Sequence, residues 1–126
     1  MTRTADGSVC GRPFLVEQQA RVAPVVRDTA WSDDVAPRVA HLTPVERATQ
    51  AEHWTKLGQM EHASIAAFAR LQLQLLALGA PPDLVQACNQ ALIDETAHTR
   101  LCFGLASAYA GRGIGPGPLD VSNKTA

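Results

Sequence analysis

The chain has 126 residues, of which 46% are hydrophobic and 18% are charged, with a formal net charge of −1. This length allows one domain at most, and the near-neutral charge gives no electrostatic case for binding nucleic acid or an anionic membrane surface. The longest apolar run, residues 65–78, is too short and too polar to span a bilayer. We therefore expect a soluble protein with no nucleic-acid or membrane partner. The high apolar and low charged content further predicts that other protein covers much of its surface.

Residues 1–42 are predicted to form an irregular N-terminal arm. The segment contains Pro13, Pro24 and Pro37 and keeps no helical or strand periodicity. Its short apolar runs favour brief extended pieces that lie over a helical surface. We expect no independent fold in this arm.

A long helix is predicted over residues 43–79. It begins with Thr43 as the N-cap, Pro44 at the first helical position and Glu46 three residues after the cap. This pattern is a capping box with proline where its missing N–H does no harm. The helical period then continues to Gly79, which is a typical C-terminal stop.

A second helix is predicted over residues 82–110, and Gly111 ends it. Because the turn between the helices is short, the two must pack antiparallel. The chain after Gly111 is too rich in glycine and proline to continue as a helix. The predicted fold class is therefore all-α: a long helical hairpin over residues 43–120, followed by a tail over residues 121–126.

Two cysteines fall on the second predicted helix. Cys88 and Cys102 are 14 residues apart, or about 21 Å along the helix axis, so they cannot form a disulfide with each other. We interpret both as packed small hydrophobic residues. A reducing compartment, and hence a cytoplasmic location, is favoured.

Acidic and imidazole side chains interrupt the apolar stripes of both helices. A carboxylate on a core-facing stripe is costly to bury unless its charge is compensated, and a metal ion is one of the few adequate partners. Glu61 lies about 27 Å from the turn, while Glu95 and His98 lie about 20–24 Å from it, so all three are expected at a similar height on facing stripes. The first stripe consists of Trp54, Leu57, Glu61, Ile65, Phe68, Leu75 and Leu78, and the second of Leu84, Cys88, Leu92, Glu95, His98, Cys102, Leu105 and Tyr109.

Three other polar residues are weaker candidates. His62 points about 100° away from Glu61 around the helix, which favours a surface or interface position. His53 is about 12 Å from Glu61 along the axis, too far for a shared ligand set. Ser64 has no base-and-acid arrangement nearby, so nucleophilic catalysis is not predicted.

The segments MEHASIAAFAR and DETAHTRLCFGLASAYAGR resemble one repeat of the ferritin-like di-iron carboxylate superfamily, closest to bacterial ferritin-like domain proteins of unassigned substrate. The resemblance implies half of a four-helix bundle that holds two iron ions, or manganese in place of iron. It implies that Glu61 is a terminal carboxylate ligand, Glu95 a bridging carboxylate and His98 an imidazole ligand. Asp94 matches the acid that orients a ligand histidine from outside the metal's own ligands.

The sequence departs from that pattern because it ends where a second hairpin with its own ligands should begin. Either a C-terminal hairpin is missing, or two copies form a homodimer with a shared site. A lone hairpin would expose an apolar stripe that monomers rarely tolerate, so we expect no stable monomer. The stripe includes Ile65, Phe68, Leu75, Leu92 and Leu105.

The function implied is a metal-binding, ferritin-like oxidoreductase that acts on Fe(II), peroxide or an unidentified substrate with dioxygen. No catalytic residue is predicted beyond the metal ligands. The alternative is a metal-free helical dimerisation or interaction module, whose acids are satisfied by hydrogen bonds across subunits. A buried acidic cluster without metal would need bases nearby, and Arg70 and Arg100 lie off the two stripes.

Overall fold

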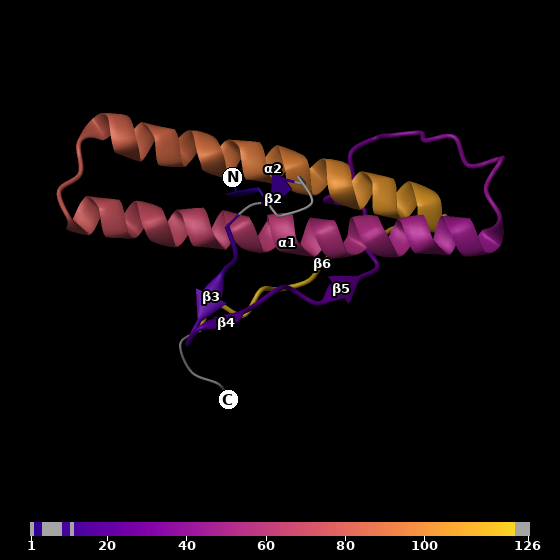
Figure 1. The fold of residues 1–126 in the computed structure, drawn as a ribbon, viewed down its shortest axis with the longest axis horizontal. Coiled ribbons are helices and arrows are strands. Elements are labelled where there is room, and N and C mark those ends of the chain that lie inside the picture. Colours follow the sequence, from indigo (N-terminus) through magenta and orange to yellow (C-terminus); the bar gives the residue numbers. More distant parts are fainter. Residues whose placement is uncertain (1, 4–8, 11, 123–126) are drawn as a thin grey trace.

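Two long antiparallel helices dominate the computed structural model, which describes residues 2–3, 9–10 and 12–122 (Figure 1). Helix α1 spans Pro44–Ala77 and helix α2 spans Pro82–Ala110, and they pack together along their length. The predicted helical hairpin is therefore confirmed. No helix in the described part of the chain is long and apolar enough to cross a membrane.

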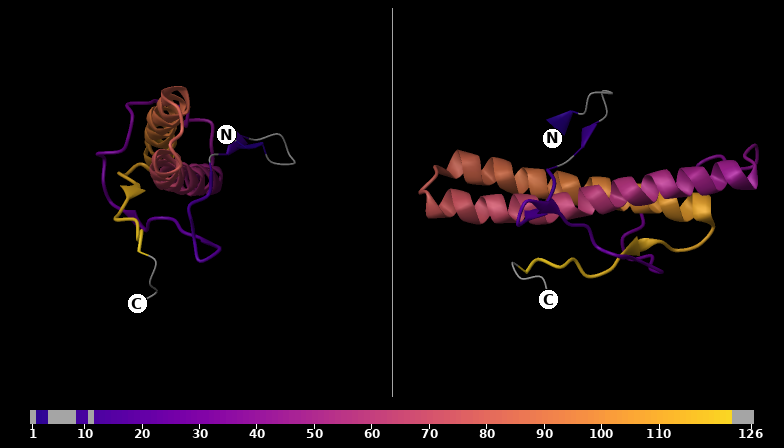
Figure 2. Two further views of the ribbon diagram at one scale, coloured as in Figure 1. Left: turned by 90° about the vertical axis from the view of Figure 1, so that its left-hand side faces the viewer. Right: turned by 60° about the horizontal axis from the view of Figure 1, so that its bottom comes forward.

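Short strands occur outside the hairpin, so the prediction of an all-α chain is right only for its helical part. Each of these strands has only two residues. Figure 2 shows the arm passing around the outside of both helices, with the tail running back beside it. In antiparallel pairs, β1 (Thr2–Arg3) joins β2 (Val9–Cys10), β3 (Leu15–Val16) joins β4 (Gln19–Ala20), and β5 (Val25–Val26) joins β6 (Gly115–Pro116).

The helix ends follow the predicted signals. The backbone N–H of Glu46 donates to Thr43 Oγ1 at 3.1 Å, and the backbone N–H of Thr43 donates to Glu46 Oε1 at 2.8 Å. Gly79 and Gly111 have φ values of 69° and 72°, the left-handed conformation that glycine adopts without steric cost. The capping box and both glycine stops are thus confirmed.

Helix α2 also receives a cap from α1. Arg47, in the first turn of α1, donates from Nε to Tyr109 O at 3.1 Å and from Nη2 to Ala108 O at 3.5 Å. These carbonyls belong to the last turn of α2, which contains no basic residue of its own. A cation at this position complements the helix dipole and satisfies carbonyls that lack a partner within the helix.

The arm supplies part of the hydrophobic core. Phe14 and Val16 are buried against Ala63 and Ala67 of α1, and the Ser64 hydroxyl donates to Arg12 O at 2.7 Å. A second buried cluster consists of Phe103, Ala106 and Ile114, with Trp31 and Trp54 packed against it.

Residues 31–33, which we call the strap, cross helix α2 closely. The backbone N–H of Asp33 donates to Arg100 O at 3.1 Å, and the Asp33 carboxylate pairs with the Arg100 guanidinium at 2.8 Å. The Ser32 and Ser107 hydroxyls lie 3.0 Å apart. Gly104 makes this approach feasible, because a Cβ there would lie 2.6 Å from Asp33 O.

The predicted exposure of the inner stripe needs correction. Phe68 is only 8% exposed, and the guanidinium of Arg12 lies over its ring, 5.9 Å from the centroid. The other members named above, Ile65, Leu75, Leu92 and Leu105, are half-buried. The chain thus covers part of this surface with its own arm.

Candidate metal centre

The structure brings Glu61, Glu95 and His98 together between the two helices. One potential ligand atom from each side chain lies within 4.8 Å of the other two. His98 Nδ1 is 3.9 Å from Glu61 Oε2 and 3.9 Å from Glu95 Oε1. Glu61 and Glu95 are 4% and 1% exposed, whereas the His98 side chain is 42% exposed. The cluster is therefore buried on its acidic side and open to solvent at its imidazole.

These separations suit ligands of a common ion better than direct hydrogen bonds. At 3.9 Å, the imidazole is too far from either carboxylate for a hydrogen bond. Bonds from a metal to nitrogen and oxygen ligands are roughly 2.0–2.2 Å long, so ligand atoms on one ion lie about 3–4 Å apart. Glu61 Oε2 and Glu95 Oε2 are buried without a hydrogen-bond partner in the described part of the chain. Two unpartnered carboxylate oxygens beside one imidazole fit a divalent cation.

The local environment makes the two acids electrostatically interdependent. Burial, a hydrogen bond with Glu61 and the charge of Glu61 together raise the pKa of Glu95 to about 8, with burial as the largest cause. At neutral pH and without a cation, Glu95 therefore retains a proton. A bound cation would compensate the second negative charge, and Glu95 would have to release that proton on binding.

The two cysteines on α2 are buried and free, as predicted. Cys88 Sγ donates to Phe68 O at 3.2 Å. Burial, together with the charges of Glu61 and Glu95, raises the pKa of the Cys102 thiol to about 12. Cys102 therefore stays protonated beside the cluster and serves as packing.

Asp94 and His62 take positions away from the ligand atoms. Asp94 is exposed and accepts a hydrogen bond from Gln90 Nε2 at 2.9 Å. Its role in orienting a ligand histidine stays a prediction, although its charge contributes to the raised pKa of Glu95. His62 stacks edge-on against Trp31 of the strap, with ring centroids 5.1 Å apart. The interface position predicted for His62 is thus an interface with the chain's own arm.

Sequence reasoning missed how the arm holds the helix beside the cluster. Ser64 is not predicted to be a nucleophile, yet its buried hydroxyl donates a hydrogen bond to the backbone carbonyl of Arg12. A small polar residue three positions after Glu61 on an apolar face was a signal for such a contact. Nothing in the sequence indicated that Arg12 was the acceptor, because 52 residues separate the two.

Fold and cluster together define a helical hairpin with a buried Glu-Glu-His group. No protein-family model matches the chain, and neither the curated proteins nor the solved structures contain a match.

The raised pKa of Glu95 predicts how stability depends on pH in metal-free protein. The ordinary value is 4.5 and the folded value is about 8, so between these values the folded chain binds a proton that the unfolded chain does not. The free energy of unfolding should then fall as pH rises from about 4.5 to 8, and level off above that. Urea unfolding of chelator-treated protein from pH 5 to pH 9 measures this.

Glu95→Gln should remove most of that pH dependence, because its amide does not titrate. Glu52→Gln is the matched control, since Glu52 is an exposed acid of α1 that pairs with Lys56. A pH profile that Glu95→Gln leaves unchanged would contradict the assignment of the retained proton to Glu95.

Proposed function

We propose that this chain is a ferritin-like metal-binding protein in which Glu61, Glu95 and His98 hold iron or manganese. The observation that carries the proposal is the pair of buried carboxylates, each with an oxygen that has no partner, beside an imidazole nitrogen. Burying such groups without compensation is costly, and a cation compensates both. Mixed carboxylate and imidazole ligation suits these metals.

The proposed reaction class is oxidation, with Fe(II), peroxide or an unidentified substrate together with dioxygen as reactants. When bound, iron would supply electron transfer to dioxygen or peroxide. Glu61 and Glu95 would hold the ion from the buried side, and His98 would hold it from the solvent-accessible side. Entry of a small oxidant from the His98 side fits this asymmetry.

A two-metal centre needs about twice the ligands that one chain offers. We propose that a second copy, or a C-terminal hairpin of a longer protein, supplies them. His98 and Leu101 are three residues apart and so share a face of α2, and both remain substantially exposed, at 42% and 44%. A second hairpin packed there would cover the apolar Leu101 and add its ligands beside His98.

A metal-free interaction module is the second candidate, and one observation favours it. The hydrogen bond between Glu61 and the protonated Glu95 compensates part of the buried charge without any cation. In that case the hairpin would serve only as a helical surface for dimerisation. Metal binding by the purified chain separates the two candidates.

Metal-dependent association tests the proposal directly. Chelator-treated protein should bind one Fe(II) per chain under anaerobic conditions, and sedimentation should show a dimer that iron strengthens, because ligands from two chains then share one centre. Metal analysis and sedimentation with and without iron measure both quantities. If a second hairpin of a longer protein is the natural partner, the isolated chain should dimerise poorly or aggregate.

His62→Ala is the control for this experiment, because His62 faces the strap and not the ligand atoms. A well-folded monomer that is indifferent to iron would rule out the shared centre. Chains that dimerise equally well with and without metal, and bind none, would support the metal-free module.

A further inference from the structure

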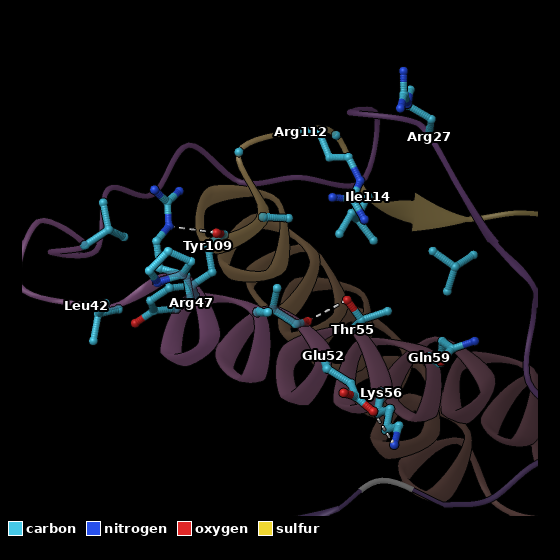
Figure 3. Close-up of a pocket in the computed structure, with 18 of the residues that line it drawn as sticks. Arg27, Leu42, Arg47, Glu52, Thr55, Lys56, Gln59, Tyr109, Arg112 and Ile114 are labelled. Atoms are coloured by element: carbon cyan, nitrogen blue, oxygen red, sulfur yellow. Dashed lines mark hydrogen bonds and ion pairs between the residues drawn. The ribbon is translucent and has the colours of Figure 1, made fainter.

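A separate cavity lies at the open end of the hairpin, opposite the turn between α1 and α2 (Figure 3). The arm, the first half of α1, the end of α2 and the start of the tail line it, and it is open to solvent. Its volume is about 1100 Å³, slightly above the usual range for small-molecule sites. Neither Glu61, Glu95 nor His98 lines it. Half of its lining residues are aliphatic, including Val25, Val26, Val39, Leu42 and Ile114.

The charged residues that line this cavity are mostly cationic. Arg27, Arg47, Lys56 and Arg112 line it, against Glu52 as the one acidic lining residue in the described part of the chain. Four cations against one carboxylate leave an excess of three positive charges, although the whole chain has a net charge of −1. The cavity is thus electropositive on a slightly acidic protein.

The cations differ in whether they already have partners. Lys56 pairs with Glu52 at 2.9 Å, and Arg47 donates to the carbonyls at the end of α2. In the region that the structure describes, neither Arg27 nor Arg112 has an ion pair or hydrogen bond through its side chain, and both are exposed. Their guanidinium groups are free to bind an anion at the cavity.

We propose that this cavity binds an aliphatic carboxylate, with its alkyl chain against the valine, leucine and isoleucine walls. Its carboxylate would bind at the exposed edge of the cavity, where the unpaired guanidinium groups of Arg27 and Arg112 are available, since a planar guanidinium matches carboxylate geometry with two parallel hydrogen bonds. Apolar walls favour the alkyl chain through its removal from water. Neither feature alone selects this ligand, but an amphiphilic anion satisfies both.

A nucleotide fits the cavity less well. Proteins that bind bases use aromatic side chains as stacking platforms, and Tyr109 is the one aromatic residue that lines this site among the described residues. The aliphatic walls match an alkyl chain better than a polar base or ribose. The inferred ligand is therefore a carboxylate with an aliphatic chain.

Octanoate is the probe. Octanol, which lacks the carboxylate, and acetate, which lacks the long alkyl chain, are the controls. Isothermal titration of the full chain should show one octanoate site per chain, at least about tenfold tighter than for octanol or acetate, because only octanoate engages both walls and guanidinium groups. Equal binding of octanol and octanoate would overturn the proposal, and so would the absence of octanoate binding. Preferential binding of an acidic hexapeptide would also overturn it.

Substitutions assign the site. The double variant Arg27→Gln and Arg112→Gln should weaken octanoate binding by about tenfold, given that exposed ion pairs contribute modestly. Arg38→Gln is the matched control, because Arg38 is an exposed arginine of the same arm that does not line the cavity. Equal effects of the double variant and the control would overturn the assignment.

Ala48→Phe provides an independent test that leaves all charges in place. Ala48 lines the cavity and is exposed on α1, so a larger side chain there fills space without entering the core. Octanoate binding should be lost while the circular dichroism spectrum stays helical. His98→Ala should leave octanoate binding unchanged, which separates this site from the metal cluster. Undiminished binding to Ala48→Phe would place the ligand elsewhere.

Discussion

Replacing Glu95 or His98 by alanine should abolish metal binding while the helical hairpin stays folded. Even residues that only orient a metal ligand cost 10–100-fold in affinity when removed, so we expect loss of a direct ligand to lower Fe(II) affinity by at least about 100-fold. Helicity should persist, because removing a buried acid with an unpartnered oxygen also removes its desolvation cost. Titration with Fe(II), followed by circular dichroism, measures both effects.

His62→Ala is the internal comparison, since His62 directly follows Glu61 in the sequence but contacts Trp31. Its effect on metal affinity should be much smaller than that of His98→Ala. Equal losses from all three substitutions would mean that metal binding responds to general disruption of the hairpin. The ligand assignment would then be wrong.

Gly104→Ala should clearly lower the free energy of unfolding, although it adds only one methyl group. The added Cβ would lie 2.6 Å from Asp33 O and 3.0 Å from Asp33 N, and backbone atoms cannot rotate away. The strap would have to move, with loss of the contacts of Asp33 to Arg100. We expect the free energy of unfolding to fall by about 1–3 kcal/mol, although alanine alone favours a helix by about 1 kcal/mol over glycine.

Urea unfolding measures this loss, and tryptophan fluorescence reports it separately because Trp31 belongs to the strap. Gly58→Ala is the matched control: its Cβ would meet ring atoms of Phe103 at 3.1 Å, and a ring can shift where a backbone cannot. A smaller loss is expected there. A Gly104→Ala protein as stable as the parent would show that the strap is not held as described.

The hairpin could be predicted from the sequence because its signals are local. A capping box joins residues three apart, glycine stops act within one turn, and the apolar period repeats every three or four residues. The grouping of Glu61 with Glu95 and His98 needed only one further step, the similar distance of each from a short turn. Their role as metal ligands stays a prediction.

The arm could not be predicted because its contacts are distant in sequence. β5 pairs with β6, so that Val26 lies opposite Gly115, and no pattern within either segment indicates the other. The turn between β3 and β4 has positive φ at Glu17 and Gln18, which rarely adopt it, so the usual glycine or asparagine signal was absent. The arginine residues of the cavity are likewise brought together only by the fold.

The contact of Arg47 with the end of α2 has a consequence for how firmly Glu61 and Glu95, the proposed ligands, are aligned. The covalent turn joins the helices at one end, and Arg47 joins them at the other. A hairpin fastened at both ends resists axial sliding of one helix along its neighbour. Sliding by a single residue would displace Glu61 from Glu95 by about 1.5 Å, far more than the roughly 0.2 Å tolerance of metal–ligand distances. The Arg47 guanidinium at the end of the hairpin thus helps to keep the Glu61 and Glu95 carboxylates at the same position along the helix axes.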